Sequence, residues 1–157
     1  MSSKHTFKAT LQWHAKSQAE LDTNPKASKN HLVKIEGKSD LNISAAKAFK
    51  GDANLLNPED LLLSSLVSCH MMSYLYCCAQ AKIEVCSYTD QAEAILDLQP
   101  DSSGRISKVI LNPKVVIADP KQLEKALSLH SEANKLCFIA NSCNFPVEHQ
   151  ASCTAEG

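Results

Sequence analysis

The sequence predicts an α+β domain in which antiparallel strands pack against two helices, and three observations support this prediction. Segments of alternating apolar and polar residues occur in pairs joined by turn-forming sequences, as in β-hairpins. Two long segments begin with a cap residue followed by proline, at Asn57-Pro58 and Asp119-Pro120, which is a helix-start signal. In order, the elements read β-β-β-α-β-β-α-β. The 157 residues are enough for a single domain, 1–157, with its own core.

The first three strands are expected in the N-terminal part of the chain. Residues 5–13 alternate in part and predict a first strand, whereas residues 16–30 are polar and rich in turn formers, which predicts a loop or hairpin connection. Residues 31–36 and 40–44 flank the sequence GKS. They therefore predict two short strands joined by a tight turn.

A long helix is predicted over residues 58–81. Asn57 can cap it, Pro58 loses no hydrogen bond at the first helical position, and the carboxylates of Glu59 and Asp60 suit the positive end of the helix dipole. The rest is apolar or small on nearly every side, so most of this helix has to be buried. Burial between the sheet and the second helix would satisfy this requirement, as would a dimer whose central helices pack together. We favour the dimer.

The next part of the chain predicts a hairpin of two long strands. Residues 83–98 and 105–118 alternate apolar and polar side chains, and the second segment is expected to bend at Pro113. Residues 100–104 form the turn between them.

The C-terminal part predicts a second helix and a last strand. Apolar residues recur at helical spacing after the second cap-plus-proline signal, and the helix is expected to end at about Leu136, with Cys137 at its end. Residues 141–144 predict a loop and residues 145–153 the last strand.

Composition and charge exclude several classes of function. The chain has 17 acidic and 16 basic residues and a formal net charge of −1, which gives no electrostatic reason to expect binding to nucleic acid or to a membrane surface. The N-terminal residues contain no apolar segment typical of a secretory signal, so we expect a cytoplasmic protein. The long helix begins with two acidic residues and is interrupted by serines, which argues against a membrane span.

Seven cysteines are many for a chain expected in a reducing compartment, where thiols serve packing, metal binding or redox chemistry rather than a disulfide framework. No pair of cysteines or histidines has the spacing of zinc ligands, so we expect no metal site. Cys77, Cys78 and Cys86 are expected to serve packing, and His70 and His130 to be satisfied core or surface histidines.

Cys69 is the candidate for chemistry because it lies in the middle of the long helix. A thiol with an ordinary pKa of about 8.5 is only partly ionised at neutral pH, so a nucleophilic cysteine needs a positive group or a hydrogen-bond donor nearby. Cys69 lies too far along the helix to be stabilised by its N-terminal dipole. Glu59 lies ten residues earlier, a rise of about 15 Å along one straight helix. If the two residues share a site, either the helix bends or Glu59 comes from a partner subunit.

Two segments resemble a known family. Residues 57–69, NPEDLLLSSLVSC, resemble the start of the cysteine-bearing helix in the OsmC/Ohr family of organic hydroperoxide reductases. Residues 130–137, HSEANKLC, resemble the end of the family's second cysteine helix, and the order of strands and helices fits over most of the chain. The resemblance implies an OsmC-like fold, with an antiparallel sheet and two central helices, and an intertwined homodimer whose sites lie at the subunit interface.

The same resemblance implies a two-cysteine thiol peroxidase that works without a metal or a bound cofactor. Cys69 matches the peroxidatic cysteine, which attacks the O–O bond and becomes a sulfenic acid. Cys137 matches the resolving cysteine, which condenses with it to a disulfide. Glu59 matches the acidic residue that orients a guanidinium beside the thiolate. An external dithiol, a lipoyl protein or a thioredoxin-like protein, would reduce the disulfide.

The positive group is where this sequence departs from the family pattern. The family's arginine precedes the NPE motif, whereas the one arginine here is Arg105. Lys47 or Lys50 would supply a positive charge without the planar fork of a guanidinium. Cys143, six residues after Cys137, is a second candidate for the resolving thiol.

Two functions are therefore left open. The first is an organic hydroperoxide reductase that uses Cys69, Cys137 and Glu59, in which apolar surroundings favour organic or lipid hydroperoxides over hydrogen peroxide. The second is a catalytically weak or inactive OsmC-like dimer that binds a small apolar ligand or partner. The retained cysteine pair favours the first function, and the missing arginine favours the second.

Overall fold

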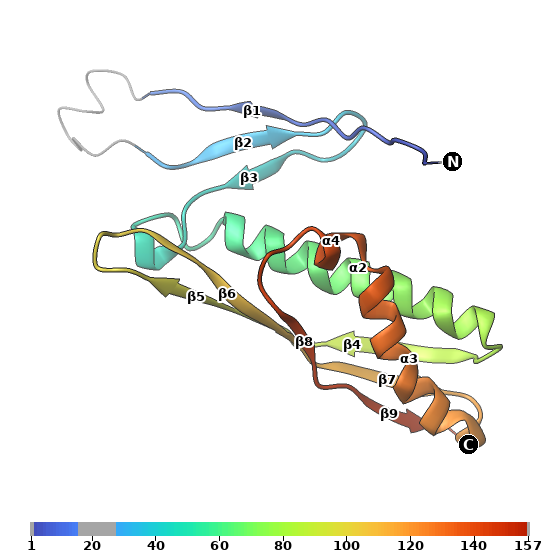
Figure 1. The fold of residues 1–157 in the computed structure, drawn as a ribbon. Helices are drawn as coiled ribbons and strands as arrows, with labels where there is room; N and C mark the ends of the chain where they lie inside the picture. Colours follow the sequence, from blue (N-terminus) through green and yellow to red (C-terminus); the bar gives the residue numbers. More distant parts are fainter. Residues whose placement is uncertain (1, 16–27, 157) are drawn as a thin grey trace. The chain divides into compact units, whose positions relative to one another are not determined.

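The computed structural model describes residues 2–15 and 28–156, and its elements are those of an α+β fold (Figure 1). The chain divides into two compact units, residues 1–61 and 62–157. Helix α2, Pro58–Gln80, begins in the first unit and continues into the second. The predicted α+β class is confirmed.

The first unit contains a three-stranded antiparallel sheet in the order β1-β2-β3. The predicted strands over residues 31–36 and 40–44 are confirmed in shortened form as β2 and β3, and Gly37 adopts a φ of 75° in the turn between them, where a residue without Cβ fits best. The strand predicted over residues 5–13 is limited to three residues. The connection predicted over residues 16–30 lies mostly outside the described residues. The strands are β1 (Thr10–Gln12), β2 (His31–Lys34) and β3 (Leu41–Ile43).

Helix α2 has the predicted start. The Asn57 side-chain oxygen accepts the Asp60 N–H at 2.8 Å, and an Asp60 carboxylate oxygen accepts the Asn57 N–H at 3.3 Å. This reciprocal arrangement satisfies donors that the first helical turn leaves open. At the other end, Lys82 adopts a φ of 56° and Ile83 N–H donates to the Cys78 carbonyl at 2.8 Å, a Schellman-type stop.

The second unit contains two three-stranded sheets instead of one long hairpin. One sheet has the order β4-β7-β9 and the other β5-β6-β8. Pairs β4–β7 and β5–β6 are antiparallel, whereas β6–β8 and β7–β9 are parallel, so both sheets are mixed. The strands are β4 (Val85–Asp90), β5 (Glu93–Leu98), β6 (Gly104–Leu111), β7 (Pro113–Ile117), β8 (Val147–His149) and β9 (Ser152–Ala155).

Both predicted long strands are wrong as continuous elements, because each is interrupted at the same level. The Asp90 carboxylate accepts the Asn112 backbone N–H at 2.7 Å, and the Asn112 side-chain amide donates to the Gln91 carbonyl at 2.9 Å. These side-chain bonds replace ladder bonds at the corner, and Pro113 has no N–H to continue the ladder. The bend expected at Pro113 is therefore a division between two sheets. The predicted last strand is likewise divided into β8 and β9.

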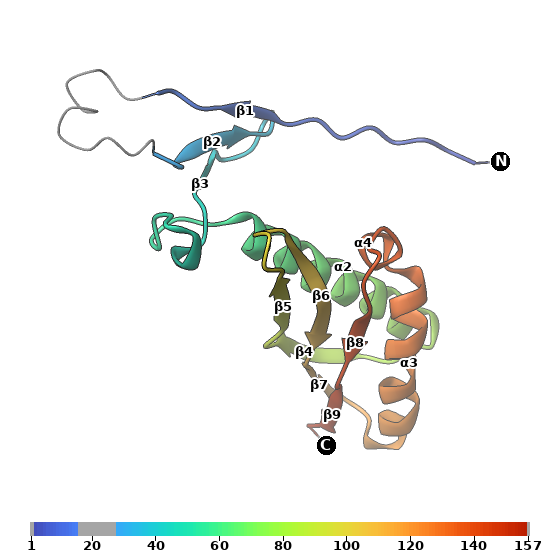
Figure 2. The ribbon, with the colours of Figure 1, turned by 60° about the vertical axis from the view of Figure 1, so that its left-hand side comes forward.

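Helix α3, Leu123–Leu136, follows the predicted second signal through a 3₁₀ turn, η2, Pro120–Gln122. The Asp119 carboxylate accepts the Lys121 N–H at 2.9 Å and so begins this turn. Both views show α3 running alongside β9 (Figures 1 and 2). A short helix that the sequence did not predict, α4, Phe138–Asn141, comes directly after α3.

Two apolar cores lie in the second unit, and α2 contributes to both. The first core joins α2 and α3 to the sheet β4-β7-β9, and the second joins α2 to β6. Their buried members are Tyr74, Cys77, Cys78, Ile83, Val115, Ile117, Ala126, Leu129 and Ala133 in the first, and Leu66, Val109 and Leu111 in the second.

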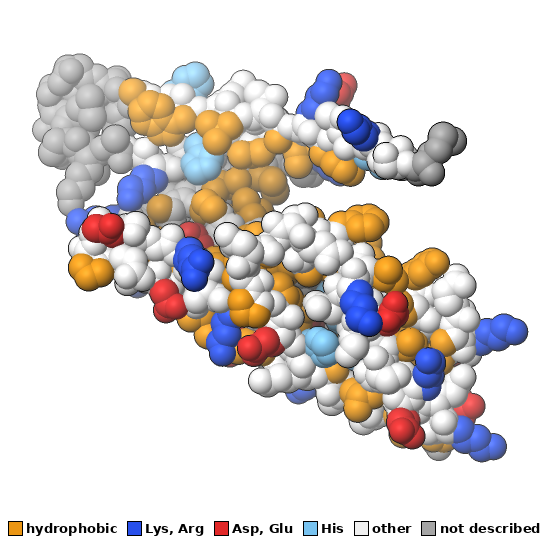
Figure 3. Space-filling view, viewed as in Figure 1, with side chains coloured by type: hydrophobic (Ala, Val, Ile, Leu, Met, Phe, Trp, Pro, Cys, Tyr) orange, Lys and Arg blue, Asp and Glu red, His pale blue; other side chains and the backbone are white. Residues whose placement is uncertain are grey.

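Helix α2 is less buried in this single chain than its sequence, which is apolar on nearly every side, predicts. Five of its 23 residues are buried, whereas Met72 and Tyr76 are 57% and 59% exposed. Helix α2 is also long and apolar enough to cross a membrane. The core helices of soluble proteins often have the same length and composition. Charged side chains of both signs are interspersed on the visible face of the molecule (Figure 3). The exposed side chains of Met72 and Tyr76 belong to an apolar strip of α2 that is left uncovered in the second unit.

Candidate active site

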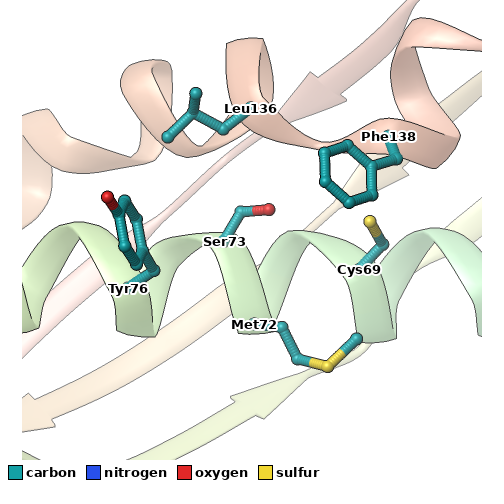
Figure 4. A pocket seen from close by; sticks show the side chains of 6 residues that line it. All are labelled: Cys69, Met72, Ser73, Tyr76, Leu136 and Phe138. Atoms are coloured by element: carbon teal, nitrogen blue, oxygen red, sulfur yellow. The ribbon is translucent and has the colours of Figure 1, made fainter. Parts of the chain in front are cut away.

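The apolar strip of α2 forms one wall of a pocket of about 400 Å³ (Figure 4). Four of its lining residues are spaced i, i+3, i+4 and i+7 along α2, which places them on one face of the helix. The opposite wall comes from the last residue of α3 and the first residue of α4. The lining residues are Cys69, Met72, Ser73, Tyr76, Leu136 and Phe138.

Cys69 is half-buried and belongs to the pocket lining. In Figure 4 its sulfur lies below the ring of Phe138, which is 81% exposed and covers this end of the pocket. None of the six lining residues carries a charge. A small apolar molecule could therefore reach the Cys69 sulfur from the pocket without any charged group being desolvated.

Cys137 lies next to Cys69 and is only 1% exposed. It ends α3 and begins α4, and its thiol accepts the Ala140 N–H at 3.4 Å as a helix cap. Burial raises the pKa of the Cys137 thiol to about 11, and the neighbouring Cys69 thiol adds to the rise. The structure thus places a protonated, buried thiol beside a half-buried thiol at the pocket, although the two residues are far apart in sequence.

Glu59 lies ten residues before Cys69 on the same unbroken helix. At about 1.5 Å of rise per residue, its carboxylate cannot contact the Cys69 sulfur of its own chain. Glu59 is half-buried, and its Oε2 atom is buried without a hydrogen-bond partner among the described residues. A buried carboxylate oxygen without a partner is costly, so this position is suited to a cation or donor other than those of the described residues.

The candidate cations are not among the pocket residues. Lys47 lies in the 3₁₀ turn η1, Lys47–Phe49, and Lys50 follows it with a φ of 62°, both in the first unit. Arg105 lines a separate cavity of about 180 Å³ at the end of the β5–β6 hairpin. Over residues 2–15 and 28–156, no group of three or more His, Cys, Asp or Glu side chains is arranged to hold a metal ion.

The other cysteines differ in their surroundings. Cys143 packs against the second core and donates to the Ile139 carbonyl at 3.2 Å, and burial raises its pKa. It is half-buried and does not belong to the pocket lining. Cys77 and Cys78 are buried, as predicted. The expected packing role of Cys86 is wrong, because this side chain is exposed on β4.

A histidine cluster lies in the core of the second unit. His70 and His130 are 1% and 0% exposed, and His70 Nε2 lies 3.0 Å from His130 Nδ1. Tyr74 stacks on His130 with ring centroids 4.0 Å apart, and the His149 ring lies 5.9 Å from that of His70. Burial lowers the pKa of His70 to about 4, and the nearby His149 adds to the effect.

His70 and His130 are core residues, which was one of the two predicted possibilities, but each has a ring nitrogen without a hydrogen-bond partner among the described residues. Burial, with the neighbouring histidines His70 and His149, lowers the pKa of His130 to about 3. His70 Nδ1 and His130 Nε2 have no hydrogen-bond partner among the described residues. Sequence reasoning did not place His149, Ser73 or Phe138 in the site. Ser73 could have been found from its position four residues after Cys69, whereas His149 and Phe138 are brought in by tertiary structure.

Comparison with known proteins identifies the family. The model of the family described as OsmC-like protein matches residues 51–152. No curated protein matches the chain.

Solved structures share the fold over nearly the whole chain. An OsmC-like protein of unknown function from Vibrio cholerae has 29% sequence identity and a TM-score of 0.80, and the match covers 94% of this chain and 99% of that one. An organic hydroperoxide resistance protein OsmC from Legionella pneumophila has 17% identity and a TM-score of 0.69, with 98% and 99% covered. The organic hydroperoxide resistance protein OhrB of Bacillus subtilis has 17% identity and a TM-score of 0.62, with 96% and 98% covered. Because the family model matches well over half of the chain, the protein belongs to the OsmC-like family.

Proposed function

We propose that this protein is a thiol peroxidase that reduces organic hydroperoxides through a Cys69 sulfenic acid and a Cys69–Cys137 disulfide. One observation carries the proposal: a half-buried thiol opens onto an apolar pocket and has a second, buried thiol beside it. Membership of the OsmC-like family supports a peroxide-related role. The pocket residues favour an organic hydroperoxide over hydrogen peroxide, because apolar walls gain contact with an alkyl group and offer little to water.

The reaction proceeds in two steps on the protein. The Cys69 thiolate attacks the terminal peroxide oxygen, so that an S–O bond forms while the O–O bond breaks, and the alkoxide takes a proton to leave as an alcohol. The Cys137 sulfur then attacks the Cys69 sulfenic sulfur. The S–S bond forms, and the Cys137 proton leaves with the sulfenic oxygen as water. An external dithiol, a lipoyl protein or a thioredoxin-like protein, supplies the two electrons that restore both thiols.

The two cysteines have environments that suit these separate roles. A resolving thiol with a pKa raised by burial remains protonated while Cys69 reacts. It therefore does not compete for peroxide. Cys69, which lies at the pocket, is the thiol that an incoming hydroperoxide meets first.

The proposed assembly is a homodimer in the cytoplasm. The exposed apolar strip of α2 and the unpartnered Glu59 oxygen both support a second subunit, which would cover the strip and supply the group that Glu59 faces. Lys47 or Lys50 of that subunit are candidates for this group. No metal or bound cofactor takes part in the proposed chemistry.

The alternative is a weak or inactive OsmC-like dimer that binds a small apolar ligand or partner in the same pocket. The lack of any charged residue among the six lining residues favours this alternative. A pocket of this size and apolar lining would accept a small ligand whether or not Cys69 reacts.

Thiol counting separates the two functions. Reduced protein is mixed with one equivalent of cumene hydroperoxide, and free thiols are counted after denaturation. The peroxidase loses two thiols per chain within minutes, and Cys69→Ser abolishes the loss. Cys86→Ser is the matched control, because it removes an exposed cysteine outside the pocket and leaves the loss of two thiols unchanged. Wild-type protein that keeps all seven thiols would contradict the peroxidase and support the ligand-binding alternative.

A further inference from the structure

Ser73 is the polar neighbour of Cys69 in the pocket. It lies four residues after Cys69, so the two side chains occupy the same face of α2 one turn apart. Side chains on a helix lean towards its N-terminus, which directs Ser73 back towards Cys69. Figure 4 shows the Ser73 hydroxyl pointing towards the Cys69 sulfur.

The Ser73 hydroxyl is free to donate. Serines within helices often give their hydroxyl proton to a carbonyl of the preceding turn. Ser65 donates to the Leu62 carbonyl at 2.7 Å, and Ser128 to the Lys125 carbonyl at 2.7 Å. Ser73, in contrast, makes no hydrogen bond within the described residues. It is half-buried in the pocket lining, so its hydroxyl is available to a group in the pocket.

No other lining group is as well placed to stabilise negative charge on Cys69. The remaining side chains are apolar except Tyr76, whose hydroxyl lies at the opposite end of the pocket, towards Leu136 (Figure 4). The lining contains no positive charge. Among the six lining residues, Ser73 is therefore the neutral donor nearest to a thiolate at Cys69, beside the neighbouring Cys137 thiol, which lies outside the lining. A hydrogen bond to a charged acceptor is stronger than one between neutral groups.

We propose that Ser73 is a catalytic residue whose hydroxyl donates a hydrogen bond to the Cys69 thiolate once it forms, and then to the leaving oxygen during reaction. This inference rests on the proposed peroxidase function of the same pocket. The hydroxyl stabilises the thiolate and then the alkoxide that forms as the O–O bond breaks. It remains a hydroxyl throughout. The proton that converts the alkoxide to the alcohol comes from water, and the two electrons come from the Cys69 sulfur.

Two measurements test the inference, and the first needs no peroxide. The rate of Cys69 alkylation by iodoacetamide is followed by peptide mass spectrometry at neutral pH, and this rate reports how readily the thiolate forms and reacts. Without the hydroxyl the thiolate loses a donor, so we expect Ser73→Ala to slow the alkylation of Cys69 about 10-fold at neutral pH. We expect the rate constant for cumene hydroperoxide to fall about 10- to 100-fold at neutral pH.

The control variants separate the hydroxyl from the helix. Ser73→Thr keeps the hydroxyl and should restore most of both effects. Ser64→Ala makes the same substitution at an exposed position of α2 outside the pocket, and should leave both values unchanged. Thermal unfolding of each variant checks that α2 is intact. We expect no loss of helix from Ser73→Ala, because alanine favours helices more than serine does.

The outcomes distinguish this inference from the proposed function. Unchanged alkylation and peroxide rates in Ser73→Ala would overturn the role of Ser73 and leave the peroxidase standing. A loss in Ser73→Ala that Ser73→Thr does not restore would also overturn it. Slower alkylation of Cys69 in Ser73→Ala, together with wild-type protein that does not react with peroxide, would support the hydrogen bond and overturn the peroxidase.

Discussion

Cys69 and His70 are neighbours in sequence, yet they face two opposite environments of helix α2. Cys69 is half-buried at a pocket without charged lining residues, whereas His70 is buried in an aromatic cluster with His130. Successive helix positions are rotated by about 100°, so the two side chains cannot share a site. The neighbouring histidine is therefore no base for the cysteine.

The electrostatics of the two sides differ in the same way. Burial holds His70 and His130 neutral at pH 7, because their pKa values are lowered to about 4 and about 3. They offer no positive charge to a thiolate. If Cys69 is the reactive thiol that we propose, α2 separates reactivity from stability: one face presents a thiol to ligands, and the other packs in the core. Four predictions test this separation, beginning with the largest effect.

Exchanging one residue from each face should give opposite results. We expect Cys69→Ser to abolish peroxide-driven thiol loss and to change the free energy of unfolding by less than about 1 kcal/mol. We expect His70→Gln to keep the thiol loss but to destabilise the fold by about 1–3 kcal/mol, because it disturbs buried hydrogen bonding and stacking. Urea unfolding and thiol counting on both variants provide the measurements. A His70→Gln protein that is stable but unreactive would show that the two faces of α2 are coupled, which would refute the separation.

Cys137 and Cys143 provide a second contrast on the reactive side. In Cys137→Ser, oxidation should stop at the Cys69 sulfenic acid, which dimedone traps and mass spectrometry detects. In Cys143→Ser, the disulfide should form in normal yield, since Cys143 is bonded to the Ile139 carbonyl and lies outside the pocket lining. Undiminished disulfide in Cys137→Ser would instead assign the resolving role to Cys143.

Acidification should weaken the histidine side. Both pKa values are lower in the folded state than the ordinary value of about 6.5, so the unfolded chain binds protons that the folded chain does not. Stability is therefore complete above pH 6.5 and falls as pH drops towards about 4. Together, the two histidines lower the free energy of unfolding by up to about 2.7 kcal/mol for each pH unit of acidification.

The control for this pH dependence is His130→Gln compared with His5→Gln. The first removes one buried histidine and should reduce the slope of unfolding free energy against pH between 6.5 and 4.5. The second removes an exposed histidine and should leave the slope unchanged. Because His149, Tyr88 and Asp90 also lie near the cluster, the slope is measured as a difference between variants. Equal slopes in all three proteins would show that the cluster does not control acid stability.

Phe138→Ala should give the smallest effect. Phe138 is 81% exposed, so we expect a stability change within about 0.5 kcal/mol. Loss of this pocket wall should reduce the preference for cumene hydroperoxide over hydrogen peroxide several-fold, because an aryl group loses apolar contact. The ratio of the two second-order rate constants is the measurement, and an unchanged ratio would remove Phe138 from the substrate site.

The parts of the fold that sequence predicted are those determined locally. The start of α2 follows from Asn57, Pro58 and Asp60, whose hydrogen bonds lie within one turn. The division of the long strands does not, because it depends on Asp90 bonding to Asn112 across the hairpin. An alternating pattern continues through such a corner, so periodicity alone reads two strands as one.

The candidate site divides along the same line. Cys69 and Glu59 were found from a motif within one helix, and their roles remain predictions. The proximity of Cys69 and Cys137 could be inferred only from resemblance, because tertiary packing brings α3 and α4 to α2. Helical spacing alone would have placed Ser73 on the same face as Cys69. That its hydroxyl makes no bond to the backbone of the described residues could be seen only in the structure.

Cys137 also has a consequence for the motion of the backbone. Its sulfur is the acceptor with which α4 begins, so a reaction that draws this sulfur into a new bond weakens the hold on the Ala140 amide. Hydrogen exchange at that amide would then be faster in the oxidised protein than in the reduced one. Since α4 also carries Phe138, the reductant would meet a looser entrance than the one the peroxide entered.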